Sequence, residues 1–334
     1  MTTPTMKATV LAVADEPYCL WEHPLDTHNL DFLKGIDAEY FAAVGRMAAP
    51  EKQEAIEDEH RAATVARLAF HQGIETLFSL LGAMLQAPKC VYAWLAKCGN
   101  STLRDIVSAI SNGSFPGPMQ LQGADPTWEL LAMFVLDDSD APIEIRIAAA
   151  KNFGKLWARL AQDFVAPRTA QEYNSLKHGF RVAPGGFSLE ISKDSAVGDI
   201  ADSASPTMIP LGGSIHGVSY FNVEKIAGEQ GANRSIVGRR YRRNWNARQT
   251  ILLLELISHS LRNVISRLQQ INDVTVSAVN YSFPTEEQFA TPWTHSVGVV
   301  GMELNRTIPE GVVCATTKQE LNELLNDRHA PVDE

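Results

Sequence analysis

The densest group of side chains able to do acid–base chemistry lies in the stretch EYNSLKHG, residues 172–179. Tyr173 and Lys177 are four residues apart, as are Asn174 and His178, so each pair would be neighbours on a helix surface. A histidine that titrates near neutrality could act as a general acid or base while a lysine stabilises charge on a phosphate. The structural alternative is a helix C-terminus where Lys177 and His178 complement the helix dipole and cap carbonyls.

A second polar group lies on a predicted long helix over residues 50–86. Arg67, His71 and Glu75 follow one another at intervals of four residues and would form one polar ridge beside the apolar face. The ridge is either an ion-pair ladder within the helix or one side of a polar pocket between helices. We expect His178 to approach this ridge. The candidate catalytic residues are therefore His178, Lys177, Asn174, Tyr173, Glu75 and His71.

An arginine-rich stretch is the third feature with chemical potential. Residues 234–248, RSIVGRRYRRNWNAR, contain six Arg and no acidic residue. Interleaved arginine and aromatic side chains suit phosphates and stacked bases, and arginine favours bidentate phosphate contacts. The candidate nucleic-acid-binding residues are Arg239, Arg240, Arg242, Arg243, Tyr241 and Trp245. The alternatives are a solvated entrance to a helix, or a partner for the acidic residues of the first sixty.

The overall charge opposes that local basicity. The 334-residue chain has a formal net charge of −10, and its first sixty residues hold twelve Asp or Glu against four Lys or Arg. A strongly acidic molecule should not coat nucleic acid or anionic membranes indiscriminately. No run approaches eighteen apolar residues and no signal peptide is evident, so we expect a cytoplasmic protein without a membrane partner.

The four cysteines indicate a reducing compartment. Cys19, Cys90, Cys98 and Cys314 form no CxxC pair and have no nearby histidine at zinc-ligand spacing. A chain of this size does not need disulfides to fold, so all four are expected to be free thiols. The motifs GxxxxGK[ST], GxGxxG after a strand, HExxH and GxSxG are also absent. The sequence therefore predicts no cofactor and no metal site.

Hydrophobic periodicity predicts which elements position these residues. Helical spacing continues through residues 50–86, and again through 142–165 with Ile145 in the apolar stripe, until Pro167 starts a second helix that Thr169 caps and Gly179 ends. Shorter helices are expected at 88–98, 101–111 (capped by Ser101) and from 125–126 to 136, whereas residues 21–31 read as a loop. Lys7–Ala14 is expected to be a short strand.

The pattern changes after Arg181. FSLEISK at 187–193 alternates apolar and polar residues as a half-buried strand does, and 207–223, 274–281 and 295–304 predict further strands. Helix returns at 244–271 and at 318–326. The fold class is therefore mainly α, a helical bundle with a small antiparallel β-sheet. We expect a mixed segment at 1–49, a bundle at 50–181, and a sheet with its long helix at 182–334 packed on the bundle.

The stretch EYNSLKHG at the end of a predicted bundle resembles the HEPN superfamily, helical domains common in bacterial toxins and phage-defence proteins. The resemblance covers about residues 50–180 and rests on Asn174, Lys177 and His178. Active members are metal-independent ribonucleases with an Arg, four to six residues, then a His; here nine residues separate Arg168 from His178. The resemblance thus implies a helical bundle without the family's ribonuclease motif, and many such domains are inactive and serve in binding.

Two classes of function follow. The first is a non-catalytic or weakly catalytic interaction or defence-type protein, with a homo-oligomer or another protein as partner. The second is an RNA- or DNA-binding protein, or a ribonuclease, that uses the 239–245 patch and His178.

Overall fold

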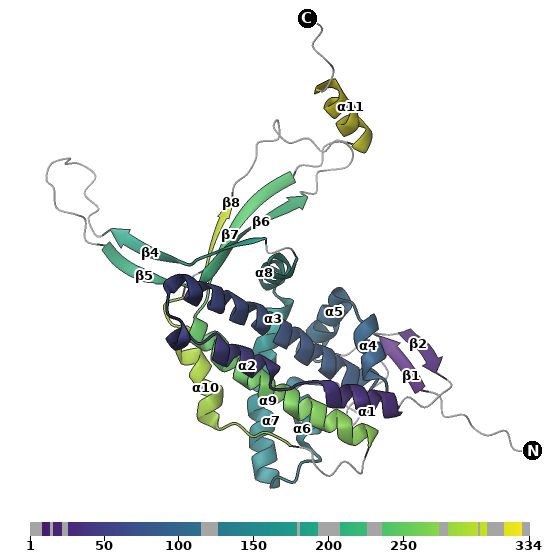
Figure 1. Ribbon diagram of the computed structural model, residues 1–334. Coiled ribbons are helices and arrows are strands. Elements are labelled where there is room, and N and C mark those ends of the chain that lie inside the picture. Colours follow the sequence, from purple (N-terminus) through teal and green to yellow (C-terminus); the bar gives the residue numbers. More distant parts are fainter. Residues whose placement is uncertain are drawn as a thin grey trace, which may run out of the picture.

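The fold is a bundle of helices with a four-stranded antiparallel sheet at one end (Figure 1). The computed structural model describes residues 9–13, 16–21, 26–114, 126–178, 181–192, 208–225, 236–273, 280–299, 301–305 and 317–328. The predicted fold class, mainly helical with a small antiparallel sheet, is confirmed.

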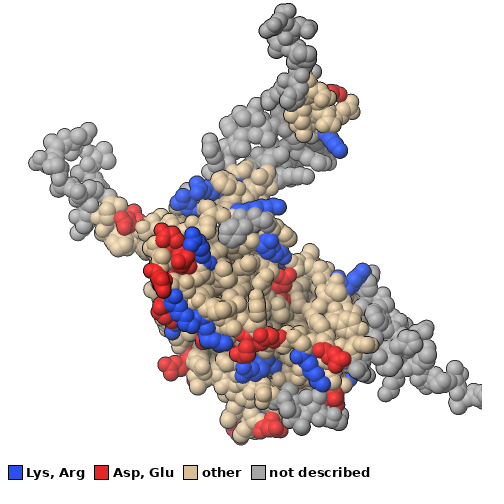
Figure 2. Space-filling view, in the orientation of Figure 1, with Lys and Arg blue, Asp and Glu red and all other residues tan. Residues whose placement is uncertain are grey.

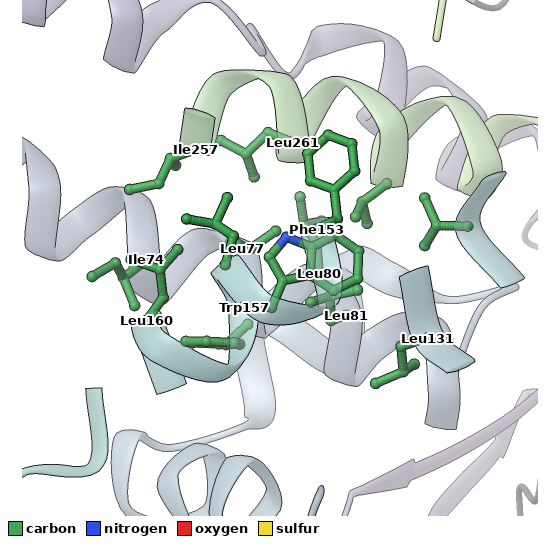
Figure 3. Packing of buried hydrophobic residues seen from close by; sticks show 14 of the residues in the cluster. Ile74, Leu77, Leu80, Leu81, Leu131, Phe153, Trp157, Leu160, Ile257 and Leu261 are labelled. Atoms are coloured by element: carbon green, nitrogen blue, oxygen red, sulfur yellow. The ribbon is translucent and has the colours of Figure 1, made fainter. Parts of the chain in front are cut away.

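Three long helices form the centre of the bundle: α3 (Ile56–Gln86), α7 (Ile143–Val165) and α9 (Ala247–Asn272). Their apolar side chains belong to one continuous core, in which Leu77 of α3, Trp157 of α7 and Leu261 of α9 are almost fully buried (Figure 3). The indole N–H of Trp157 donates to Ser260 Oγ at 3.0 Å, so the polar atom of this large core residue is satisfied.

The apolar face predicted for residues 244–271 is confirmed, because every inward-facing residue expected there is buried. These residues are Ile251, Leu254, Ile257, Leu261, Val264, Ile265 and Leu268. The expectation for Ile145 in α7 was wrong. Its side chain is 47% exposed, because the first turns of α7 extend beyond the helices that cover the rest of it.

The other helices of the described chain are shorter. They are α1 (Asp26–Gly35), α2 (Tyr40–Met47), α4 (Val91–Lys97), α5 (Asn100–Ser111), α6 (Trp128–Leu136), α8 (Pro167–Lys177), α10 (Glu286–Thr294) and α11 (Lys318–Arg328), with a 3-10 turn η1 at Pro50–Lys52. The expected loop at 21–31 was wrong from residue 26 onward, where α1 begins. α10 was not predicted, although a Thr285–Gln288 capping box starts it.

Helix boundaries differ from the predictions where the capping residue was misjudged. Pro50 begins the 3-10 turn and not α3. Ser101 lies inside α5, whose N-cap is Gly99. α6 begins only at Trp128, since the Thr127 side chain accepts a hydrogen bond from the backbone N–H of Leu130.

The break at Pro167 is confirmed, and the proline occupies the first turn of α8, where its missing N–H costs nothing. Thr169 does not cap the helix as expected. It is the third residue of the helix, is buried, and accepts a hydrogen bond from Arg243. The predicted stop at Gly179 falls outside the described residues.

All the strands pair antiparallel. β1 (Thr9–Val13) pairs with β2 (Glu16–Trp21), and β4 (Phe187–Ser192) pairs with β5 (Met208–Ser214). The four-stranded sheet has the order β3-β6-β7-β8, built from β3 (Val182–Pro184), β6 (Gly217–Lys225), β7 (Ile236–Asn244) and β8 (Met302–Asn305). Of the two strands expected last, most of 274–281 lies outside the described residues, and 295–304 is extended only from Met302.

Residues 236–244 of the arginine-rich stretch form strand β7, so the solvated helix entrance, one of the alternatives for 234–248, was wrong. Tyr241 pairs with Tyr220 of β6 in the sheet register, and α9 begins only at Ala247 with Asn246 as its cap. The alternation of apolar and polar residues that marks a strand is hidden here, because arginines occupy positions on both faces.

A second, smaller core attaches the sheet to α3 and α8. It consists of Leu176, Val218, Tyr220, Tyr241 and Trp245. Gly217 permits the close approach of strands at this point, since a Cβ atom there would lie 2.6 Å from the carbonyl oxygen of Arg243.

Two further features bear on the sequence predictions. Among the described helices, α3 alone meets the length and hydropathy of a membrane span, and 72% of that window is buried inside the bundle. Cys90 and Cys98 are free thiols. The side chains of Cys19 and Cys314 lie outside the described part of the structure.

Candidate functional site

A buried carboxylate, Glu172 of α8, organises the polar centre of the molecule. Arg67 of α3 binds it in a bidentate manner, with Nε 2.7 Å from Oε1 and Nη2 3.1 Å from Oε2. Glu172 is fully buried, so this pairing provides the charge compensation that a buried carboxylate requires.

Two further basic side chains converge on the same carboxylate. Arg243 of β7 places Nη1 3.3 Å from Glu172 Oε2 and donates to Thr169 Oγ1 at 3.1 Å. His71 of α3 has Nε2 3.3 Å from Glu172 Oε1, a distance without good hydrogen-bond geometry. One carboxylate therefore connects the bundle, through Arg67 and His71, to the sheet, through Arg243.

The charge states follow from this arrangement. Burial lowers the pKa of His71, and the nearby Arg67 and Arg243 lower it further against the opposing effect of Glu172. Burial alone would raise the pKa of Glu172, but the charge of Arg67 and its hydrogen bond outweigh burial and hold that pKa well below its usual range. At neutral pH the cluster therefore contains a neutral imidazole, an ionised carboxylate and two guanidinium groups.

Tyr173, the neighbour of Glu172, covers the other side of His71. The two rings stack with centroids 5.3 Å apart, and Lys177 Nζ lies 4.4 Å from the centroid of the Tyr173 ring. Burial, together with a hydrogen bond to Glu75, raises the pKa of Tyr173. The polar ridge of α3 is thus one side of a contact between helices, and the ladder within one helix was the wrong alternative.

Very little space remains beside these groups. The crevice lined by His71, Arg104, Thr169 and Tyr173 has a volume of about 10 Å³. That is close to the volume a single water needs. A substrate therefore has no room to reach the imidazole of His71 in this conformation.

The structure brings together only part of the predicted catalytic group. His71, Glu75, Tyr173 and Lys177 meet between α3 and α8, whereas Asn174 and His178 are exposed. His178 is the C-cap of α8, more than one helical turn beyond the residues that face His71. Glu172 was missed. Its signal was the spacing Thr169, Glu172, Leu176, which places it on the buried face of α8.

The arginines of β7 divide between the two faces of the sheet. On the face toward the bundle, Arg243 binds Glu172, and the Arg168 guanidinium lies 4.3 Å from the centroid of the Tyr241 ring. Tyr241 and Trp245 are 2% and 4% exposed, so the expectation that they stack on bases was wrong. Both rings are needed to fill the small core that joins sheet and bundle.

One arginine of the stretch 234–248 contacts the acidic residues of the first sixty, as the second alternative expected: Arg248 Nη1 lies 3.6 Å from Glu51 Oε1. His216 contacts the same acidic segment, with Nε2 2.9 Å from Glu59 Oε1.

The opposite face of the sheet is open to solvent. Phe221 and Val223 of β6 are 70% and 65% exposed there. Arg240 lies cross-strand from Phe221, with its guanidinium 5.6 Å from the ring centroid, and Arg242 follows on the same face. Figure 2 shows Lys and Arg side chains where the sheet rises from the bundle.

The β4–β5 hairpin projects from the molecule and exposes apolar residues (Figure 1). Asn244 attaches its base to the sheet by accepting from Phe187 N and donating to Phe187 O. Beyond that base the exposed side chains are Ile191, Met208, Ile209 and Leu211, each between 45% and 56% exposed. Ile191 and Ile209 are directly paired across the strands and so share one face.

A cavity of about 470 Å³ lies between α7 and α10. Lys155, Arg159 and Trp293 line it, and the Arg159 guanidinium lies 4.3 Å from the centroid of the Trp293 indole. No group of three His, Cys, Asp or Glu residues able to hold a metal ion occurs among the described residues.

Comparison with known proteins does not add to this description, since no protein family, curated protein or solved structure matches the chain.

Proposed function

We propose that the protein is a non-catalytic interaction protein in which the helical bundle is a scaffold and the β4–β5 hairpin joins two copies of the chain. The observation that carries this proposal is the concentration of half-exposed apolar side chains on the hairpin. Exposed apolar surface of this kind commonly marks an interface.

Several features favour a second copy as the partner. A two-stranded hairpin is marginal in water by itself. Beyond the contacts of Phe187 and Gly213 at its base, neither outer edge of this hairpin pairs with a further strand among the described residues. Its described residues include one charged side chain, Glu190, so like charges would not oppose self-association. Closed two-fold dimers are also the commonest oligomers of soluble proteins.

The buried cluster supports a non-catalytic role. The charges of Arg67 and Glu172 neutralise each other, and the crevice beside His71 holds no more than about a water. The HEPN resemblance fits this proposal, because many HEPN domains are inactive and serve in binding. In this chain Asn174 and His178 lie apart from the buried His71. A defence-type role belongs to the same proposal.

The test is the oligomeric state of the full chain, measured by size-exclusion chromatography with light scattering. Wild type should be a dimer, and Ile191→Ser combined with Ile209→Ser should give a monomer of unchanged circular dichroism. The matched control is Val65→Ser with Ile143→Ser, which removes two apolar side chains of 55% and 46% exposure from helices. A monomeric wild type, or equal dissociation by both double variants, would reject the proposal.

A second candidate is single-stranded nucleic-acid binding by the open face of the sheet. Phe221 offers a ring for base stacking, and Arg240 and Arg242 beside it offer phosphate contacts. RNA binding that weakens steeply with salt, and by about 1–3 kcal/mol in Phe221→Ala, would support it. Phosphate contacts are strong at low salt, near about 50 mM. If the protein does not bind RNA even there, this second candidate is rejected.

A further inference from the structure

The cavity between α7 and α10, two helices that lie side by side in Figure 1, combines basic side chains with aromatic rings. Its volume of about 470 Å³ lies within the range of small-molecule sites, roughly 300–1,000 Å³. The basic lining residues are Lys155 and Arg159 of α7, and the aromatic ones are Phe289 and Trp293 of α10. A lining of this kind is suited to an anionic group joined to an apolar body.

The aromatic part of the lining is fixed by the core of the bundle. Phe289 is 8% exposed and meets Phe153 of α7 edge-on, with ring centroids 5.0 Å apart. Trp293 lies one helical turn later on α10, is half-buried, and has the Arg159 guanidinium over its indole at 4.3 Å from the ring centroid. The cavity is therefore bounded on one side by a core residue and on the other by a cation–aromatic pair that faces solvent.

The two basic side chains are available to a ligand. Lys155 and Arg159 are exposed, and neither forms a hydrogen bond or an ion pair with any residue that the structure describes. They are four residues apart on α7, so they lie on one face of the helix. The contact with the indole restricts the Arg159 guanidinium while its N–H donors keep no protein acceptor. Such donors match the two oxygens of a carboxylate.

One carboxylate, Glu286, is among the described lining residues. It precedes Trp293 by two helical turns, about 10 Å along the helix axis, so it lies toward the other end of the cavity. Four other charged residues lie on these helices or against them without lining the cavity: Glu129 of α6, Lys151 and Asp163 of α7, and Glu287 of α10. None of these carboxylates forms an ion pair with Lys155 or Arg159, and the charge of Asp163 acts on Arg67 and Arg243.

We propose that this cavity binds a small aromatic carboxylic acid, with its carboxylate on Arg159 and Lys155 and its ring against Trp293 and Phe289. A carboxylate suits Arg159 because two parallel N–H···O bonds can form at once. An aromatic body suits the indole because edge-to-face and offset ring contacts add to the burial of apolar area. The inference goes beyond dimerisation, since no described residue of the β4–β5 hairpin lines the cavity.

The experiment is calorimetric titration of the full chain at low salt with phenylacetate, its neutral counterpart phenylacetamide, and acetate. Wild type should bind phenylacetate at least about ten-fold more tightly than the other two, because it alone has both the charge and the ring. Arg159→Gln and Lys155→Gln should each weaken phenylacetate binding by about ten-fold, as expected for a lost charge-assisted hydrogen bond.

Lys151→Gln is the matched control. It removes a positive charge from an exposed side chain one turn before Lys155 on the same helix, and Lys151 does not line the cavity. This variant should bind phenylacetate as wild type does. Glu286→Gln should not weaken binding either, because Glu286 lies toward the end of the cavity away from Trp293. All four replaced side chains are exposed, so each variant should fold as wild type does.

The proposal is overturned if wild type binds phenylacetate no more tightly than phenylacetamide and acetate. It is also overturned if Arg159→Gln and Lys151→Gln bind phenylacetate equally, which would mean diffuse attraction to the basic face of α7, or if Glu286→Gln weakens binding as much as Arg159→Gln. None of these results bears on dimerisation, which Ile191→Ser with Ile209→Ser tests separately.

Discussion

Three basic groups converge on Glu172 of α8: Arg67 and His71 from α3, and Arg243 from β7. Replacing Glu172 with alanine would leave Arg67 buried and unpaired, which costs about 3–5 kcal/mol for a buried ion pair broken on one side. We therefore expect Glu172→Ala to lower the free energy of unfolding by that amount in urea denaturation. Glu51→Ala is the matched control, since Glu51 is 63% exposed in its pair with Arg248 and its loss should cost less than about 1 kcal/mol. Equal effects of the two substitutions would contradict the central role of Glu172.

His71 and Glu172 give the stability of the protein a defined dependence on pH. The pKa of His71 is lower in the folded than in the unfolded chain. As pH drops below about 6.5, the histidine of the unfolded chain therefore takes up a proton before His71 of the folded chain does, and the free energy of unfolding falls. The pKa of Glu172 is also lowered on folding. Its ionised carboxylate therefore stabilises the fold above about pH 4.5, and this stabilisation is lost as the pH falls further. The groups that face them are Arg67, Arg243, Tyr173 and Asp163.

The measurement is the free energy of unfolding of wild type and His71→Gln between pH 7.5 and 5.0, roughly one unit on either side of the histidine reference value. The decline toward pH 5.0 should be shallower in the variant, because one buried histidine no longer has to accept a proton. His216 and His259, whose pKa values burial also lowers, remain in both proteins and supply the shared part of the slope. Parallel curves would show that His71 does not contribute.

At the scale of elements, Trp245 tests how the sheet is joined to the bundle. It fills the small core between β7 and α3, with the Arg67 guanidinium 5.4 Å from its ring centroid. Trp245→Ala should therefore cost about 3–5 kcal/mol of stability, as large buried aromatics do. Phe221→Ala, at a side chain 70% exposed on the opposite face, should change stability by no more than about 0.5 kcal/mol. Similar melting temperatures for the two variants would show that Trp245 does not hold the elements together.

The elements that the sequence predicted best are those whose apolar period is undisturbed. α9 follows a stripe from Ile251 to Leu268, and β4 alternates strictly, so each could be found from local pattern alone. β7 could not, because arginines occupy both its buried and its open face. Whether Arg243 faces solvent or Glu172 depends on α8, which lies some seventy residues earlier in the chain. The candidate site was predicted in part, since Arg67 and His71 were found but their carboxylate was not.

At the scale of the whole molecule, charge is distributed by element rather than evenly. The chain is acidic overall, yet β7 contributes arginines to both faces of the sheet while the acidic residues of α3 cluster in its first turn. Such segregation lets an acidic protein present one basic surface, so net charge alone does not describe the surface of the sheet.

The position of α9 in the core has a consequence for synthesis on the ribosome. α9 packs against α2 and α3, although 199 residues lie between α2 and α9 and 160 between α3 and α9. While residues 1–181 emerge, Leu77 and Phe78 of α3 have no apolar cover from α9. The nascent bundle must wait for residue 272 before its centre closes, and long-range closure of this kind slows folding and prolongs exposure to aggregation. We expect a fragment of residues 1–181 to bind hydrophobic dyes and to lack a cooperative melting transition, and a fragment extended to residue 273 to regain one.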